Sequence, residues 1–426
     1  MTIRMLQAWN GLHQQKIVTT LSGSDEAALV AAGIATYDLD GPADNLRMAQ
    51  LATDAGGNTL WVIGGDGQPI NNVGAFQLKK WRLALGKALA GTSNARIAFV
   101  GDSTTAGLAG GSTVFMQSIP CIAGKILNKS LLQTNLGSVF GDLTRNNPAN
   151  GFPTFDPRVG GFSSWLQTGY GTAGGYAFGN STNTNSLTFT PSDAFDTIDV
   201  YSIDNTGGYG QWTINVDGGA TLTTVDNAQA VRAIRKTTVS CAPGTHTINI
   251  QRNGVGGQVF IIGIATRNST VKTIDIYNLG SGGSTSADWI STNGINNLSA
   301  LQVYAPDLSV IDIGINDRRL GLYTTAFQTN LQTVVTAAKV TGDVILCVPV
   351  PSSLDYSAYT TADNIAAYNA AIYRVAAASG CPVINKESIF TSYVSGNANG
   401  YYNDTLHPSS AGYAILGQQM SQLLMV

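Results

Sequence analysis

Three short polar motifs contain the residue types that could perform chemistry in this chain: GDS at 101–103, GIND at 314–317 and DTLHP at 404–408. The first supplies a serine, and the third supplies a histidine together with a carboxylate. A serine hydroxyl is a poor nucleophile unless a base accepts its proton, and that base works best when a third group orients it. Nucleophilic catalysis by an activated serine is therefore the first chemistry to consider.

Only one of the three histidines has a carboxylate beside it in a loop. His13 lies in the amino-terminal segment, and His246 lies on a predicted strand, where it is most simply a surface or core side chain. Asp404 precedes His407 by three positions, in a loop that ends at Pro408. The two side chains can share one turn, with Asp404 holding one tautomer of the ring. If any histidine is the base, it is His407.

A parallel α/β sheet is predicted to position these motifs. Short apolar runs typical of buried strands, and helical patterns between or after them, alternate along the chain. The runs lie at 97–100, 273–277, 308–313, 343–348 and 382–384, and the helical patterns lie at about 325–339, 361–379 and 409–424. This alternation favours a sheet covered on both faces. Ligands bind beyond the carboxyl ends of such strands, so we expect the three motifs to converge there.

In this order and placement, the motifs resemble those of the SGNH (GDSL-type) hydrolases. The resemblance covers about residues 95–145 and 270–426, and it implies a flavodoxin-like α/β/α sandwich with a parallel sheet. It also implies that Ser103 is the nucleophile and that His407 is the base, oriented by Asp404.

The resemblance further implies an oxyanion hole made of the backbone N–H of Ser103, a glycine N–H and an Asn side chain. Asn316 of the GIND motif matches the Asn. The run NLGSGGS at 278–284 resembles the family's second motif, so the glycine role falls to Gly283, with Gly282 as the alternative. The first two motifs usually lie a few tens of residues apart, whereas Ser103 and Gly283 are 180 positions apart here. An inserted domain would account for that gap.

Each motif also has a plain structural interpretation. An Asp-Ser turn is often only a turn, and GIND could be a strand exit in which Asn caps a helix. The glycine-rich run at 278–284 could cradle a phosphate, but it lacks the GxGxxG spacing and the Walker lysine. The four cysteines (Cys121, Cys241, Cys347 and Cys381) show no CxxC spacing and no neighbouring histidine, which favours buried free thiols. We expect no metal and no cofactor.

Between about 146 and 268, short alternating runs separated by turn pairs such as Asp217-Gly218 replace the α/β pattern. They predict an antiparallel β-sandwich inserted between the first two strands of the α/β domain. The amino-terminal segment contains a helix candidate at 24–32. The expected division is a small attachment or oligomerisation domain (1–92), a discontinuous hydrolase domain (93–145 and 269–426) and a carbohydrate-binding-like insert (146–268).

Aromatic side chains of the predicted insert could stack on sugar rings or fill the sandwich core. They are Trp165, Tyr170, Tyr176, Tyr201, Tyr209 and Trp212. Core packing is favoured for any one of them. Tyr209 and Trp212 adjoin a glycine-rich turn, so we expect these two to be exposed and take them as candidate substrate-binding residues.

Composition excludes several classes of function. The 426 residues are 43% hydrophobic, which excludes wholesale disorder, and the 49 glycines with only 12% charged residues favour turn-dense, β-rich domains. The net charge is −3 without any basic stripe, so no nucleic-acid partner is expected. No run of about 18 apolar residues occurs, which predicts no membrane insertion. The first twenty residues lack the apolar core of a secretory signal.

These observations predict a serine esterase that removes O-acetyl groups from an acetylated polysaccharide or oligosaccharide. The β-sandwich and the lack of an exposed apolar helix favour a sugar ester over a lipid. The first forty residues are similar to segments of phage and prophage tail-associated proteins, which would make the chain a virion component acting outside the cell, as a homo-oligomer such as a trimer. Otherwise it would be cytoplasmic. The alternatives are a receptor-binding or structural tail protein with a vestigial hydrolase fold, and a lipase or thioesterase.

Overall fold

The computed structural model describes a large part of the chain, and every structural statement below concerns that part. The described residues are 2–5, 18–20, 35–37, 48–53, 59–64, 78–109, 114–129, 133–140, 156–161, 165–168, 177–181, 185–291, 297–353 and 365–425.

A parallel sheet forms the centre of the α/β part, and its strand order within the described residues is β22-β21-β20-β6-β19-β7. The strands are β6 (Ala95–Gly101), β7 (Thr134–Asn135), β19 (Ile274–Gly280), β20 (Leu308–Asp312), β21 (Asp343–Val348) and β22 (Val383–Asn385). Every residue of β19 and β20 is buried, as expected for apolar runs in a sheet covered on both faces. The strand order reverses between β6 and β20, which is where doubly wound sheets bind their ligands.

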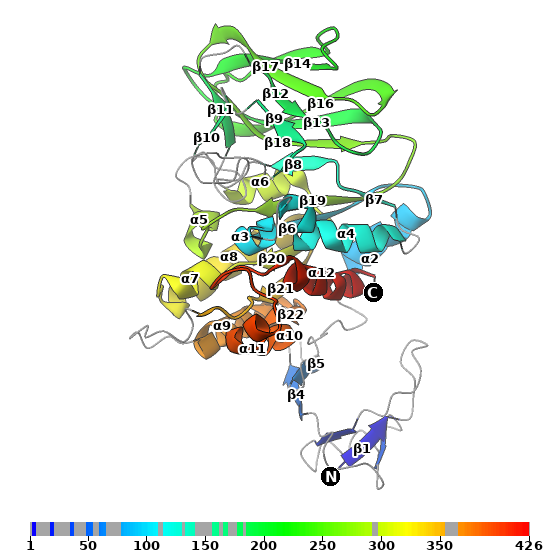
Figure 1. Ribbon diagram of the computed structural model, residues 1–426, viewed down its shortest axis with the longest axis vertical. Helices are drawn as coiled ribbons and strands as arrows, with labels where there is room; N and C mark the ends of the chain where they lie inside the picture. Colours follow the sequence, from blue (N-terminus) through cyan, green and yellow to red (C-terminus); the bar gives the residue numbers. More distant parts are fainter. Residues whose placement is uncertain are drawn as a thin grey trace.

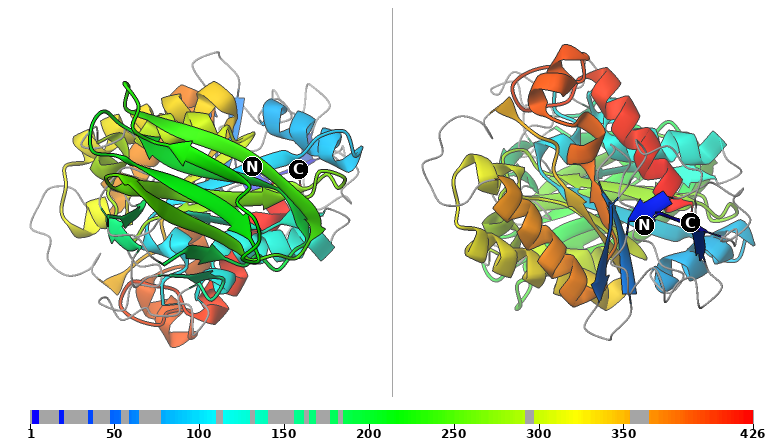
Figure 2. Two further views of the ribbon diagram at one scale, coloured as in Figure 1. Left: turned by 90° about the horizontal axis from the view of Figure 1, so that it is seen from above. Right: turned by 90° about the horizontal axis from the view of Figure 1, so that it is seen from below.

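Helices cover both faces of this sheet (Figures 1 and 2). The helices of the described residues are α2 (Lys79–Leu89), α3 (Ser103–Ala106), α4 (Ile119–Lys129), α5 (Ser286–Ile290), α6 (Asn297–Tyr304), α7 (Ile315–Arg319), α8 (Thr324–Thr341), α9 (Ile365–Ser379), α10 (Lys386–Phe390), α11 (Tyr393–Ala398) and α12 (Ser410–Leu424). A 3₁₀ helix, η3 (Val114–Gln117), precedes α4. Side chains of α2, α4 and α12 share an apolar core with one face, and those of α5, α6, α8 and α9 share another with the opposite face. This three-layer arrangement confirms the predicted α/β/α fold. The start of the helix predicted at 361–379 lies outside the described residues.

Two antiparallel sheets between β7 and β19 pack face to face as a sandwich (Figure 1). In the described residues, one sheet has the order β10-β11-β18-β13-β16, with β8 also paired to β18, and the other has the order β15-β14-β17-β12-β9. The strands are β8 (Ser138–Phe140), β9 (Val159–Gly160), β10 (Leu166–Thr168), β11 (Ala177–Asn180), β12 (Leu187–Phe189), β13 (Phe195–Asp204), β14 (Gly210–Val216), β15 (Thr223–Asp226), β16 (Ala233–Gly244), β17 (Ile248–Gly256) and β18 (Val259–Arg267). The antiparallel part therefore begins at β8, earlier in the chain than residue 146.

The sandwich shares a core with the α/β domain. Successive side chains of β13 point to opposite faces of its sheet. Val200 therefore faces the other sheet of the sandwich, whereas Tyr201 lies in the core of the α/β domain. There the Tyr201 ring meets Tyr304 of α6 edge to face, with 4.9 Å between ring centroids, and Phe140 of β8 also contacts Tyr304. Buried aromatic side chains thus join the sandwich to the α/β domain.

The amino-terminal segment contributes two small antiparallel sheets to the described residues. Strands β1 (Thr2–Met5), β2 (Val18–Thr20) and β3 (Ala35–Tyr37) pair in the order β2-β1-β3, and β4 (Met48–Thr53) pairs with β5 (Thr59–Gly64). The helix predicted at 24–32 lies outside the described residues, as does most of the segment that resembles tail-associated proteins. Among the helices of the described part, none has the length and apolar character required to cross a bilayer.

Candidate active site

Ser103, His407 and Asp404 lie in one hydrogen-bonded chain, although 304 positions separate the first two. Ser103 is the first residue of α3, directly after β6, and it is buried. The His407 Nε2 atom lies 3.0 Å from the Ser103 Oγ atom, and the His407 Nδ1 atom lies 2.9 Å from Asp404 Oδ2. The structure therefore brings together the serine, the histidine and the carboxylate that the motifs predict.

The turn that presents Ser103 depends on its neighbours in the motif. Asp102 caps α3, because its Oδ1 atom accepts from the backbone N–H of Thr104 at 2.8 Å. Gly101 allows β6 to turn sharply into this helix. A Cβ atom there would lie 2.1 Å from Thr105 Oγ1 and 2.7 Å from the backbone oxygen of Asp312, so any side chain would displace the turn.

The Asp404 carboxylate organises the loop that carries His407. Its Oδ1 atom accepts from the backbone N–H groups of Leu406 and His407, at 2.7 and 2.6 Å. Partial burial raises the pKa of Asp404, but the hydrogen bonds from His407 and Leu406 outweigh it and lower that pKa to about 2. These bonds favour the folded loop above the ordinary aspartate pKa of 3.8, and their contribution is lost as pH falls through about 2.

The ionised Asp404 carboxylate also fixes the histidine tautomer. It can only accept hydrogen bonds, so the proton of the neutral ring resides on Nδ1 of His407. The Nε2 atom then has a lone pair that accepts from the Ser103 hydroxyl. This is the orientation that a general base requires.

Asn316 and the glycine-rich run meet at the same edge of the sheet. The backbone oxygen of Gly101 accepts from the N–H of Ser281 at 2.9 Å, which ties the run to the end of β6. The Nδ2 atom of Asn316 donates to the backbone oxygen of Ser284 at 2.9 Å. A side-chain amide has two such protons, so a second remains for a substrate oxygen. Gly283 is exposed and has a φ of +78°, a conformation that favours glycine.

Asp317 positions this edge, a role that its sequence context alone did not predict. Its buried carboxylate accepts from the backbone N–H of Ser286 at 2.9 Å and from the Ser286 hydroxyl at 2.5 Å. The phenol of Tyr368 donates to the Asp317 backbone oxygen at 3.1 Å. Asp317 thus joins α7, which carries Asn316, to the start of α5. The sequence signal that could have identified Asp317 is its place in the GIND motif, directly after Asn316.

The expectation that Trp212 is exposed is wrong. Trp212 is 0% exposed and lies in the sandwich core, because it alternates along β14 with the outward-facing Gln211 and Thr213. Tyr209 is half-buried, and its ring packs against Phe260 with 5.2 Å between centroids. Neither ring stands free on the sandwich surface as a pair for sugar stacking.

The other aromatic candidates follow the same pattern. Trp165 is fully buried in the sandwich core, and Tyr201 is fully buried in the core shared with the α/β domain. Tyr170, Tyr176 and the histidine at position 13 lie outside the described residues. The favoured interpretation of core packing therefore holds for each of these aromatic rings that the structure describes.

His246 makes a separate pair in the sandwich. Its Nδ1 atom lies 2.6 Å from Asp217 Oδ2, and its ring meets Phe195 edge to face. All four cysteines are free, and Cys241 is half-buried while the others are buried. Within the described ranges, no group of three or more His, Cys, Asp or Glu side chains is placed to hold a metal ion.

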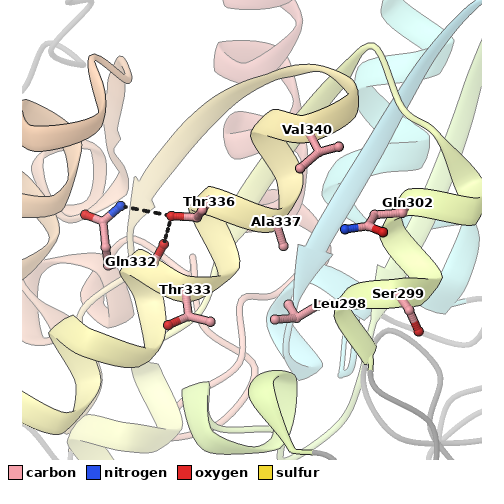
Figure 3. Close-up of a pocket in the computed structure, with 8 residues that line it drawn as sticks. All are labelled: Leu298, Ser299, Gln302, Gln332, Thr333, Thr336, Ala337 and Val340. Atoms are coloured by element: carbon pink, nitrogen blue, oxygen red, sulfur yellow. Dashed lines mark hydrogen bonds between the residues drawn. The ribbon is translucent and has the colours of Figure 1, made fainter.

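A groove of about 480 Å³ lies between α6 and α8 (Figure 3). Leu298, Ser299 and Gln302 of α6 line it from one side. Gln332, Thr333, Thr336, Ala337 and Val340 of α8 line it from the other. None of these residues belongs to the serine–histidine–carboxylate site, so the groove is a separate feature.

Comparisons with known proteins concern the family and the fold of the chain. A model of the GDSL-like lipase/acylhydrolase family matches residues 262–415. A solved structure of a peptidoglycan O-acetylesterase is 18% identical, covers 81% of this chain and 95% of its own, and has a TM-score of 0.62. No curated protein matches the chain.

Two further solved structures match about a third of the chain each. A lipase/acylhydrolase from Enterococcus faecalis is 26% identical over 35% of this chain and 75% of its own, with a TM-score of 0.30. A variant of an acetyl-xylooligosaccharide esterase from Geobacillus Stearmophilus is 18% identical over 37% of this chain and 74% of its own, with a TM-score of 0.29. The family model thus matches the carboxyl-terminal part of the α/β domain and part of the sandwich, and the peptidoglycan O-acetylesterase shares the fold of this chain.

Proposed function

We propose that this protein is a serine esterase that removes O-acetyl groups from a carbohydrate polymer. The observation that carries the proposal is the hydrogen-bonded chain from Ser103 through His407 to Asp404, at the edge where Asn316 also lies. A nucleophile, a base and an orienting carboxylate in this arrangement are the parts that acyl transfer needs.

In the proposed reaction, Ser103 Oγ attacks the acetyl carbonyl carbon while His407 Nε2 takes the hydroxyl proton. The oxygen that becomes negative is met by the N–H groups of Ser103 and Gly283 and by the Asn316 amide. The C–O bond to the sugar then breaks, and His407 returns its proton to the leaving sugar oxygen. Water repeats the sequence on the acetyl-enzyme and releases acetate. Asp404 stays ionised throughout and stabilises the imidazolium.

The acetyl and carbohydrate parts of the proposal draw on the likeness to the peptidoglycan O-acetylesterase, whose fold this chain shares at 18% identity. The decisive test is acetate release from a panel of O-acetylated polysaccharides, with p-nitrophenyl esters of increasing acyl length assayed beside it. Acetate release with falling rates on longer chains supports a deacetylase. Rising rates on longer chains would instead assign a lipase or thioesterase.

The outer face of the sandwich suggests where a neutral glycan could be held. Uncharged amide and hydroxyl side chains lie along β14 and β17, some bond to one another across the strands, and Gln211 also donates to Asp226 of β15. They are Gln211, Thr213, Asn215, Asn249, Gln251 and Asn253. Amides donate to and accept from sugar hydroxyls without requiring charge on the ligand. We therefore propose that this face, and not the buried Trp212, contacts the glycan.

Replacing two of these amides, Asn249→Ala with Gln251→Ala, should raise KM for acetylated polysaccharide by about threefold or more. kcat/KM for p-nitrophenyl acetate should stay unchanged, because a small ester uses only the active site. The matched control is Gln302→Ala with Gln332→Ala, which removes two amides from the groove between α6 and α8. An effect in the control alone would place the glycan at that groove.

Asn316→Ala should lower kcat on p-nitrophenyl acetate by about 10²–10³ with little change in KM, because the amide meets charge that develops only in the transition state. Asn316→Asp should be worse, since it puts an acceptor and a charge where a donor is needed. Asn128→Ala is the control, because Asn128 is exposed near the end of α4 and its side chain accepts from the backbone N–H of Thr134, away from the site. A change mainly in KM would make Asn316 a substrate contact instead.

A tail-associated location is a separate proposal that draws only on the resemblance of the first forty residues. Purified virions or lysates from an induced host would test it by immunodetection of the chain. A receptor-binding protein with a vestigial site would fail to label at Ser103 with a fluorophosphonate, whereas the proposed esterase would label.

A further inference from the structure

Three charged side chains that the proposed mechanism does not use are buried around the turn that carries Ser103. Asp102 is 1% exposed, Asp312 is 5% exposed and Lys386 is 2% exposed. They belong to three elements, being the cap of α3, the last residue of β20 and the first residue of α10. Charged side chains are rarely buried so completely unless they are paired.

The contacts of this cluster converge on α3. Lys386 Nζ donates to Asp312 Oδ2, and the same oxygen accepts from Thr105 Oγ1 at 3.2 Å. Asp102 Oδ1 accepts from the backbone N–H of Thr104 at 2.8 Å and from its hydroxyl at 2.9 Å. Both carboxylates therefore hold the two residues that follow the candidate nucleophile.

The charges of the cluster do not balance when all three groups are ionised, because two carboxylates share one ammonium. Burial and the neighbouring charge of Asp312 raise the pKa of Asp102 to about 7, against the opposing effect of Lys386. Burial lowers the pKa of Lys386, but Asp312 outweighs it and raises that pKa overall. Lys386 is paired directly with Asp312, and Asp102 is the carboxyl that retains its proton up to about pH 7.

The other titratable groups that act on the cluster are neutral or more remote. The buried thiol of Cys347 in β21 interacts with Asp312 and Lys386, and burial raises its pKa. The buried phenol of Tyr413 in α12 interacts with both carboxylates and with Asp404, and burial raises its pKa as well. Both stay protonated near neutral pH, so Lys386 is the cation that balances the cluster.

We propose that the Lys386–Asp312 ion pair is a positioning element of this esterase, which fixes the turn bearing Ser103 and sets the charge of Asp102 beside the oxyanion hole. This inference rests on the proposed function. A negative charge on Asp102 would lie next to the Ser103 N–H and oppose the charge that develops on the substrate oxygen. The ion pair keeps the turn in place and leaves Asp102 neutral in the active form.

The test compares wild-type protein, Lys386→Met and Asp312→Asn in kcat-against-pH profiles on p-nitrophenyl acetate. In the wild type, kcat should fall as pH rises through about 7, as Asp102 loses its proton. Removal of the ammonium should shift this fall to higher pH, and removal of the competing carboxylate should shift it to lower pH. Lys386→Met should also lower kcat by about tenfold or more with little change in KM, because the turn is misplaced.

Opposite shifts in the two variants support the proposal, since a merely structural role would not produce them. Equal profiles in the folded proteins, or shifts of the same sign, would overturn it. If Lys386→Met does not fold, the shift of the Asp312→Asn profile to lower pH decides between the two outcomes. The matched control is Lys236→Met, which removes an ammonium 2.9 Å from the buried Asp199 in the sandwich and should leave kcat and its pH profile unchanged.

A second readout separates this inference from the proposed function. If the wild-type protein hydrolyses no ester, the proposed function fails, and the Asp102 carboxyl can still be titrated by ¹³C NMR in Ser103→Ala protein. Opposite displacements of that titration by Lys386→Met and Asp312→Asn would support charge setting by the ion pair. An unmoved titration would overturn it.

Discussion

Ser103→Ala is expected to abolish ester hydrolysis, with a loss in kcat of up to about 10⁶-fold. The reason is that His407 Nε2, 3.0 Å from Ser103 Oγ, would have no hydroxyl to deprotonate. The fold should survive, because the change removes one oxygen atom and leaves the Asp102 cap of α3 intact. Initial rates on p-nitrophenyl acetate and acetate release from polysaccharide measure the activity, and a thermal melt measures whether the fold survives.

Ser410→Ala is the matched control for this experiment. Ser410 is an exposed serine at the start of α12, and its hydroxyl donates to the Gln117 side chain. Its replacement should leave kcat within about threefold of wild type, as is usual for surface substitutions. Near-normal turnover by folded Ser103→Ala protein would eliminate the covalent mechanism.

His407→Ala should cost nearly as much as Ser103→Ala, because a nucleophile and its base act as a unit. Asp404→Ala should cost less, about 10⁴-fold in kcat, since the carboxylate orients the ring and does not itself transfer a proton. The double variant Ser103→Ala with His407→Ala should be no slower than either single variant. Rates that multiplied in the double variant would show two independent contributions and contradict the shared role.

Two controls make the comparison of His407 and Asp404 interpretable. Asp404 also accepts the backbone N–H groups of Leu406 and His407, so Asp404→Ala loosens the loop as well as the ring. Asp404→Asn keeps an acceptor oxygen for these groups but places an amide N–H where Oδ2 faced His407 Nδ1, so it tests the loss of the Nδ1–H tautomer with the loop retained. His246→Ala removes a histidine paired to Asp217 in the sandwich and should leave kcat unchanged.

Much of the α/β part could be predicted from the sequence, because its signals are local. The buried strands are short apolar runs, and each motif directly adjoins the end of a strand or the start of a helix. The sheet then places Ser103 and Asn316 at one edge, since β6 and β20 are neighbours in parallel register. The loop of His407 needs only its own sequence to form the pair with Asp404.

The features that sequence reasoning missed depend on contacts between distant segments. Lys386 has no motif around it, and it meets Asp312 only because β22 and β20 both end near the same edge of the sheet. The glycine-rich neighbours of Trp212 suggest exposure, whereas the alternation of GQWTINV along β14 places it inward with Ile214. For Trp212, the two-residue alternation of the strand predicts burial correctly, whereas the adjacent glycine-rich turn does not.

The pairing of β8 with β18 has a consequence for how the two halves of the active site find each other. Phe140 lies opposite Gly263 in that pairing, so the chain enters and leaves the sandwich side by side. An unstructured connection of the same length, residues 141–258, would raise the closure entropy of the loop between Ser103 and His407 by only about 0.4 kcal/mol, because that cost grows with the logarithm of loop length. In the folded sandwich, the pairing of β8 with β18 brings Phe140 and Gly263 side by side, as a tight turn between the two strands would. The insert therefore adds little closure cost to assembly of the site, and the paired strands β8 and β18 hold together the two points at which the chain leaves and re-enters the α/β domain.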